Sequence, residues 1–167
     1  MRILVTYSSR TGNTKKVAEA IHEVMPVGTH IAPIESAPDP VNYDLILLGF
    51  WVDRGTVDEL AQSYISKINS KRVALFATLG EYPDSAHARQ SMDNARALVS
   101  PQNELLGTFI CQGRIDPALT DRFRKEGRMT PERQKLHQDA ALRPNQEDLA
   151  DAKKVFGEIL NHVLQTS

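Results

Sequence analysis

The chain has 167 residues, of which 41% are hydrophobic and 25% are charged, as is typical of a globular protein with one hydrophobic core. Its net charge of −1 argues against a large nucleic-acid surface. The single cysteine, Cys111, excludes an internal disulfide and favours a reducing compartment. The first apolar run begins at residue 3 and is too short for a signal peptide or a membrane span. We therefore expect a cytoplasmic protein without a membrane or nucleic-acid partner.

Apolar runs alternate with helical patterns along the chain, which is typical of an α/β protein with a parallel sheet. The pattern predicts strands over about residues 3–7, 29–34, 45–49, 73–78 and 104–112. It predicts helices over about residues 13–25, 57–68 and 84–98, and a last helix that Asn145 caps and that runs to about residue 164. We expect residues 1–167 to form one domain.

An additional segment, residues 114–144, lies between the last strand and the last helix. Pro117, Pro131 and Gly127 predict two short helices, over about 117–126 and 131–140. The segment is too short for a core of its own, so we expect it to pack over one end of the sheet. It has 8 basic and 5 acidic residues, which fits either a solvated helical face or a docking surface for an acidic partner.

The turn after the first strand, residues 8–14, has the composition of a phosphate site, and we call it the phosphate loop. It is rich in hydroxyl groups, contains one glycine and leads directly into a helix. The first N–H groups of a helix have no internal acceptor and lie at the positive end of its dipole, so they attract anions. The residue directly after the glycine is not a lysine, which excludes a Walker A loop, and the dinucleotide motif G-x-G-x-x-G is absent. The turn therefore suits the phosphate of a mononucleotide cofactor, and a capped helix without a ligand is the alternative.

Two later loops have aromatic side chains where a cofactor ring would lie. Residues 50–56 follow the third strand and include the chain's only tryptophan, Trp51. Residues 78–84 follow the fourth strand and include Tyr82. Ligands of open parallel sheets bind at the carboxyl ends of the strands, where the strand order reverses, so these loops should meet the phosphate loop. Stacking on a flat ring is one interpretation, and a core anchor for Trp51 and a turn residue for Tyr82 are the alternatives.

The sequence Ser9-x-Thr11-Gly12-Asn13-Thr14, placed directly after the first strand, resembles the phosphate-loop signature of the flavodoxin family. The resemblance implies a three-layer α/β sandwich whose five-stranded parallel sheet has the order 2-1-3-4-5. The helical insertion after strand five, residues 114–144, is not standard for short members of the family. It implies FMN as a non-covalent cofactor and one-electron transfer, and hence redox partner proteins. We expect no metal site. The cofactor contacts that it implies are Ser9, Arg10, Thr11, Gly12, Asn13, Thr14, Phe50, Trp51, Val52, Asp53, Gly55, Thr78, Leu79, Gly80 and Tyr82.

The chain departs from the family pattern in several places. Arg10 stands where a small hydroxyl residue is common, and it could add charge to the phosphate site or point to solvent. Many family members have a Trp-Gly pair later in this loop, whereas here Trp51 comes early and Gly55 lies four residues after it. A peptide at Gly55 or Gly80 could reach N5 of the flavin, because glycine allows the positive φ that a peptide flip needs. The chain is also less acidic than is usual, so we expect a less negative potential for full reduction of the flavin.

The leading functional hypothesis is a non-catalytic FMN protein that carries electrons between a reductase and a partner oxidoreductase. The alternative is an FMN-dependent NAD(P)H or quinone reductase with its own small substrate, in which residues 114–144 could build a pocket over the ring. A phospho-acceptor regulator ranks last, since Thr6-Tyr7-Ser8 offers no carboxylate at the end of the first strand. No catalytic residues stand out, the five histidines lack metal-ligand spacing, and Cys111 is expected to be buried and inert.

Overall fold

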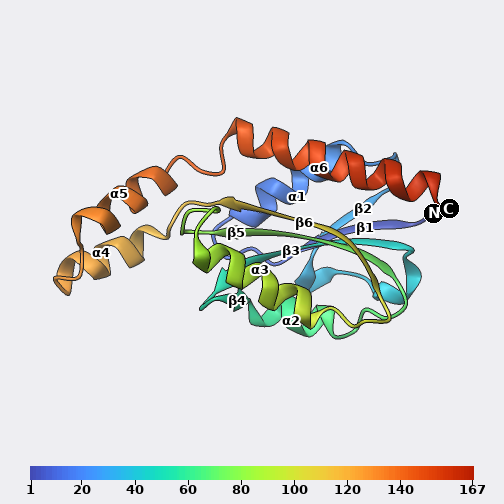
Figure 1. Ribbon diagram of the computed structural model, residues 1–167, viewed down its shortest axis with the longest axis horizontal. Coiled ribbons are helices and arrows are strands. Elements are labelled where there is room, and N and C mark those ends of the chain that lie inside the picture. The colour runs from blue at the N-terminus through green and yellow to red at the C-terminus, as the bar shows by residue number, and fades with distance from the viewer.

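The computed structural model describes residues 1–167 and shows a parallel sheet between two layers of helices (Figure 1). The order of the parallel strands is β2-β1-β3-β5-β6, which confirms the expected 2-1-3-4-5 arrangement once a short sixth strand, β4, is set aside. The strands are β1 Ile3–Tyr7, β2 His30–Pro33, β3 Leu45–Asp53, β4 Thr56–Val57, β5 Arg72–Leu79 and β6 Glu104–Gln112.

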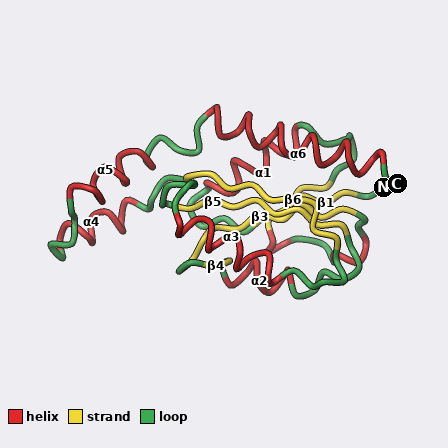
Figure 2. Tube along the Cα trace, viewed as in Figure 1, coloured by secondary structure: helices red, strands yellow, loops and turns green.

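Helices α1 and α6 cover one face of the sheet, and α2 and α3 cover the other (Figure 2). The α-helices are α1 Asn13–Glu23, α2 Glu59–Ile65, α3 Ala86–Leu98, α4 Pro117–Lys125, α5 Pro131–Ala140 and α6 Gln146–Gln165; the 3-10 helices are η1 Ile34–Ser36 and η2 Pro40–Asn42. Helix α6 begins with the predicted cap, in which Asn145 and Asp148 form a reciprocal capping box. None of the helices is long and apolar enough to cross a bilayer.

Successive residues of β3 enter two different cores. Leu45 and Leu47 pack with α1 and α6, whereas Ile46, Leu48 and Phe50 pack with α2 and α3. This alternation follows from the period of two in a strand, and the strand reads as a continuous apolar run because both faces are covered. The same parity decides which strand residues face the amino end of α1, where the phosphate loop lies.

The end of β3 differs from the expected loop. The strand continues to Asp53 and returns through a two-residue turn to β4, with which it pairs antiparallel. Both turn residues have positive φ, 49° at Arg54 and 79° at Gly55, as a tight hairpin requires. Because Val57 belongs to this hairpin and Asp58 caps α2, the helix begins two residues later than expected.

Residues 114–144 form the two predicted helices, but these do not pack over the sheet as expected. Helices α4 and α5 project from the end of the molecule opposite the two termini (Figure 1). Helix α4 has no buried residue, and in α5 only Ala140 is buried. The segment contacts the body at its two ends, through residues such as Ile115 and Arg143, because the two helices are too polar to bury a face. We call residues 114–144 the arm.

Candidate functional site

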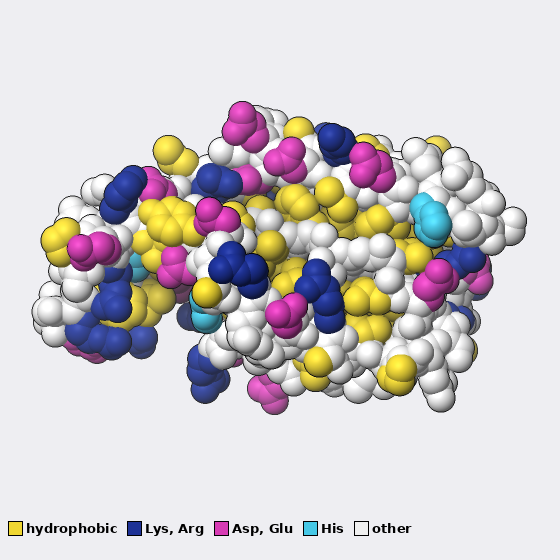
Figure 3. Space-filling view, viewed as in Figure 1, with side chains coloured by type: hydrophobic (Ala, Val, Ile, Leu, Met, Phe, Trp, Pro, Cys, Tyr) yellow, Lys and Arg dark blue, Asp and Glu magenta, His cyan; other side chains and the backbone are white.

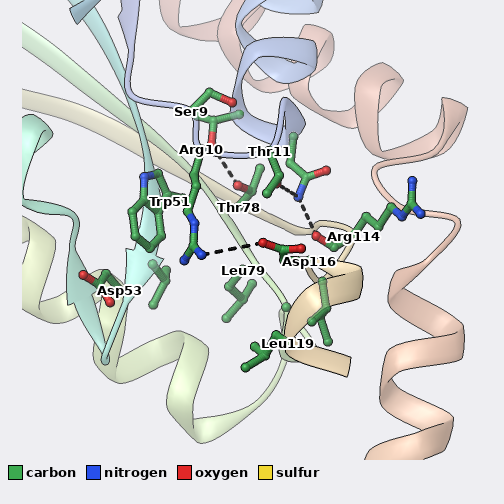
Figure 4. A pocket seen from close by; sticks show the side chains of 15 residues that line it. Ser9, Arg10, Thr11, Trp51, Asp53, Thr78, Leu79, Arg114, Asp116 and Leu119 are labelled. Carbon is green, nitrogen blue, oxygen red and sulfur yellow. Dashed lines mark hydrogen bonds and ion pairs between the residues drawn. The ribbon is translucent and has the colours of Figure 1, made fainter. Parts of the chain in front are cut away.

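A cavity of about 250 Å³ lies at the carboxyl ends of β1, β3 and β5 (Figure 4). This is the edge of an open parallel sheet where ligands bind, at the point where the chain crosses from one side of β1 to the other. Residues of the phosphate loop, of the end of β3 and of the end of β5 line it, together with the root of the arm. The three predicted loops therefore meet at one place.

The phosphate loop presents backbone N–H groups without acceptors. Gly12 precedes α1 with φ of 92°, and α1 is the one α-helix without a side-chain cap. The Ser9 hydroxyl oxygen accepts from the N–H groups of Gly12 and Lys15, at 3.2 and 3.3 Å. The N–H groups of Asn13 and Thr14 have no protein partner. An anion at this point would accept from both of these groups and gain from the helix dipole.

The Asn13 side chain is engaged with the protein instead of being free for a ligand. Its amide nitrogen donates to Thr11 Oγ1 at 3.2 Å and to the carbonyl oxygen of Arg114 at 2.9 Å. Gly113 permits this contact, since a Cβ there would lie 2.7 Å from the Asn13 amide. The bond therefore ties the phosphate loop to the root of the arm.

A buried hydroxyl pair connects the phosphate loop to β5. Thr14 Oγ1 and Thr78 Oγ1 are 2.9 Å apart, and both side chains are buried. Thr78 is two residues beyond Phe76, so it projects toward the same face of the sheet, the face that α1 covers. This pair fixes the first turn of α1 on the sheet.

The buried carboxylate of Asp58 connects three segments that form the site. It accepts from the Ser8 hydroxyl at 2.7 Å, from the Trp51 N–H at 3.2 Å and from the Ala61 N–H at 3.2 Å. The side chain is 2% exposed, and burial raises its pKa, although these hydrogen bonds act in the opposite direction. Asp58 thereby fixes the end of β1, the Trp51 backbone and the start of α2 relative to one another.

Arg10 reaches across the cavity between Trp51 and the arm (Figure 4). Its guanidinium carbon lies 5.7 Å from the centre of the Trp51 ring, and a guanidinium nitrogen lies 3.6 Å from the Asp116 carboxylate. The Arg10 side chain is 63% exposed, so this ion pair adds little to stability. The cationic group occupies space beside the one aromatic ring of the cavity.

Eleven of the predicted contact residues line this cavity. They are Ser9, Arg10, Thr11, Asn13, Thr14, Trp51, Val52, Asp53, Thr78, Leu79 and Gly80. Phe50 does not, because strand parity directs its side chain into the core under α2 and α3. Gly12 shapes the turn without lining the cavity, and Gly55 lies in the hairpin turn, where its carbonyl accepts from Asn94.

Tyr82 also lies outside the cavity. Its hydroxyl donates to Asp139 of α5 at 2.7 Å, and this hydrogen bond raises the Tyr82 pKa. The tyrosine therefore links the loop after β5 to the arm.

Sequence reasoning missed four residues of the cavity, all from the arm: Arg114, Ile115, Asp116 and Leu119. Gly80 lets the arm approach, since a Cβ there would lie 2.7 Å from Ile115. The strand order could have indicated these residues, because β6 runs parallel to β5 and its carboxyl end therefore lies at the same edge of the sheet as the predicted loops. Cys111 on β6 is buried as expected, and burial raises its thiol pKa to about 12.

The fold and the cavity define a flavodoxin-type α/β protein. The family model described as "Flavodoxin domain" matches residues 4–157, and the chain therefore belongs to the flavodoxin family.

Two proteins described as "Flavodoxin-like domain-containing protein BilS" are similar to this chain over nearly their whole length. The one from Clostridioides difficile (strain CD3) is 32% identical over 162 residues, which cover 91% of this chain and 92% of the relative. The one from Clostridium symbiosum (strain WAL-14163) is 27% identical over 177 residues, covering 90% and 91%.

Solved structures show the same fold. A flavodoxin from Streptococcus pneumoniae TIGR4 superimposes with a TM-score of 0.60 at 13% identity, covering 97% of this chain and 99% of that one. A flavoprotein from Lactobacillus acidophilus NCFM, solved in complex with FMN, gives a TM-score of 0.53 at 17% identity, covering 74% of this chain and 98% of that one. At these identities the likeness concerns the fold alone.

Proposed function

We propose that this protein binds FMN non-covalently in the cavity and carries electrons between a reductase and a partner oxidoreductase. The observation that carries the proposal is the uncapped amino end of α1, which presents two free N–H groups among hydroxyl side chains at the ligand-binding edge of the sheet. Membership of the flavodoxin family and the FMN complex of the Lactobacillus acidophilus flavoprotein support the choice of FMN.

The residues of the loop fit a phosphate dianion without a lysine. The free N–H groups of Asn13 and Thr14 would hold its oxygens, and the Thr11 and Ser9 hydroxyls would donate further hydrogen bonds. Because Ser9 Oγ already accepts from two N–H groups, its own proton is left to point toward the anion. The loop thus supplies several donors to an acceptor-only group.

The rest of the cavity would hold the flavin ring and leave its edge accessible. Trp51 offers one aromatic face, and Thr78, Leu79 and Gly80 approach from β5. When bound, FMN supplies the redox chemistry, and the protein supplies binding, orientation and electrostatics. For the ring to lie on Trp51, the Arg10 side chain has to leave the position 5.7 Å from the centre of that ring.

The second candidate is an FMN-dependent reductase that acts on NAD(P)H or a quinone. One observation favours it: a second cavity of about 250 Å³ lies between α4 and α5 and shares Arg114 and Ile115 with the first. A small substrate in that second cavity would lie beside the cofactor site. We rank this candidate lower because an electron carrier needs no such substrate site and the cavity is open to solvent between two exposed helices.

Reconstitution with FMN separates these proposals. The purified protein should bind one FMN per chain, show flavin absorption and release FMN, not FAD, on heating. With NADPH or NADH alone it should remain oxidised, whereas catalytic amounts of a flavodoxin reductase should reduce it. Rapid NAD(P)H oxidation by the protein itself would favour the second candidate, and failure to bind any flavin would contradict both.

A further inference from the structure

The arm has the opposite charge to the rest of the molecule. Residues 114–144 include 8 basic and 5 acidic residues, whereas the remaining residues include 12 basic and 16 acidic ones. The arm therefore has a net charge of +3 beside a body of −4. Figure 3 shows several lysine and arginine side chains gathered on the projecting end of the molecule. Such an asymmetry orients an approaching charged protein.

The cations of the arm are only partly neutralised within it. Three pairs form inside the arm: Arg124 with Asp121 at 3.8 Å, Arg128 with Glu126 at 3.1 Å and Lys135 with Asp139 at 3.1 Å. Arg122 and Lys125 are exposed and belong to no ion pair. These two cations, three residues apart on α4, lie on one side of the helix and are free for a partner.

An aromatic ring between two arginines adds an apolar centre to this surface. The guanidinium carbons of Arg128 and Arg133 lie 4.7 and 4.6 Å from the centre of the Phe123 ring. Phe123 is half-buried and packs edge-on against His137 at 5.9 Å. Arginine and aromatic side chains are the residue types that contribute most at protein interfaces.

The position of the arm connects this surface to the cofactor cavity. Its first residues line the cavity, and Leu119 of α4 does so from the first turn of the helix. A protein that contacts the outer part of α4 would therefore lie close to the open side of that cavity. The projecting helices bury only one residue, so maintaining a core does not explain their presence.

Building on the proposed electron-carrier function, we propose that the arm docks an acidic surface of the redox partner. The contacts would be made by Arg122 and Lys125 and by Phe123 with the two arginines that flank its ring. A protein fits this surface better than a nucleic acid. Four acidic residues alternate with the cations of α4 and α5, and they would repel the uniform charge of a phosphate backbone: Asp121, Glu126, Glu132 and Asp139. A partner with a mixed but mainly acidic rim avoids this repulsion.

Cytochrome c in two charge forms provides the probe. The native protein is basic, and full succinylation of its lysines makes it acidic with the same haem. The FMN-loaded full chain would be photoreduced and mixed with either form of cytochrome c. The rate of haem reduction would be measured by stopped-flow spectroscopy at several salt concentrations. Binding of the oxidised holoprotein to each form would be measured separately by calorimetry.

The variant Arg122→Glu/Lys125→Glu reverses two exposed cations of α4 that belong to no ion pair. Lys67→Glu/Lys154→Glu is the matched control, because it makes the same charge change at exposed, unpaired lysines outside the arm. We expect the wild type to bind and reduce the succinylated form faster as salt decreases. The arm variant should reduce it about tenfold more slowly at low salt, while the control changes the rate less than about twofold. The affinity for succinylated cytochrome c should likewise be lowered much more in the arm variant than in the control.

Equal effects of both double variants, or no effect of the arm variant, would overturn the docking proposal and leave the electron-carrier proposal standing. Tighter binding of a single-stranded RNA than of succinylated cytochrome c would overturn the choice of a protein partner. Holoprotein that reduces neither form would overturn the electron-carrier proposal, and the docking proposal with it. Native far-ultraviolet circular dichroism and unchanged FMN binding would confirm that each variant is folded.

Discussion

The sheet body and the arm are held together by different forces. In the body, strand parity divides apolar side chains between two cores, one of 17 buried residues and the other of 15. In the arm, the helices rely on polar contacts: Asp116 and Thr130 cap them, and His137 bonds Thr120 across the pair at 2.7 Å. Burial of apolar area dominates the free energy of folding, so we expect the body to supply most of the stability of the chain. The arm's sequence is therefore free to serve the site and a partner.

Removal of a large core side chain should give the largest effect and sharpen this contrast. Phe76 is fully buried and meets Phe156 edge-to-face at 5.7 Å, so Phe76→Ala should lower the free energy of unfolding by about 4 kcal/mol. Phe123→Ala in the arm should lower it by less than about 1 kcal/mol, because that ring is only half-buried. Urea unfolding followed by circular dichroism measures both. A comparable loss for the two variants would contradict the division between body and arm.

The support beneath the site should give the next largest effect. Asp58→Ala removes the cap of α2 and leaves the Ser8 hydroxyl and the Trp51 N–H without an acceptor, so we expect a loss of about 2–3 kcal/mol. FMN should also bind more weakly, because Ser8 and Trp51, which Asp58 holds in place, belong to the segments that form the cavity. Asp39→Ala is the control, since it removes an exposed cap from the short helix η2. If both variants lose equally little, Asp58 does not organise the site.

The smallest expected effect is a pH dependence confined to the arm. Burial and the charges of Arg133 and Arg124 lower the pKa of His137 below its ordinary value of 6.5. The neutral form of His137 is therefore favoured in the folded arm. The stability that this preference gives to the arm is fully present above pH 6.5 and is lost as the pH falls below that value. Hydrogen-exchange protection of α4 and α5 should decrease between pH 7 and 5.5, while that of the sheet stays constant. The variant His137→Gln should remove this difference between the two regions; a decrease of equal size in the variant would contradict the assignment to His137.

The sequence predicts the body and the phosphate loop because their signals are local. The run from Leu45 to Gly49 predicts a strand buried on both faces, and the hydroxyl-rich turn before α1 predicts an anion site. The extension of β3 was missed because the predicted strand ends at Gly49 and the residues after it are assigned to a loop, although Phe50, Trp51 and Val52 continue the apolar run. A hairpin whose first turn residue is Arg54, with φ of 49°, gives no Asn-Gly or Asp-Gly signal.

The remainder of the site depends on contacts between residues that are far apart in the chain. Ser8 and Asp58 are separated by 50 positions, and Asn13 and Arg114 by 101. No local pattern encodes such pairs, because each partner alone reads as a turn or a cap residue. The pairing of Tyr82 with Asp139 has the same character, and it explains why an aromatic residue in the expected loop lies outside the cavity.

Comparison of FMN with riboflavin tests the central claim most directly. The two ligands share the ring system and differ only in the phosphate, which the uncapped end of α1 and the Thr11 and Ser9 hydroxyls would hold. Two charge-assisted hydrogen bonds contribute about 3 kcal/mol together, so we predict that riboflavin binds at least about 100-fold more weakly than FMN in titrations of flavin fluorescence. Equal affinities for FMN and riboflavin would contradict the account.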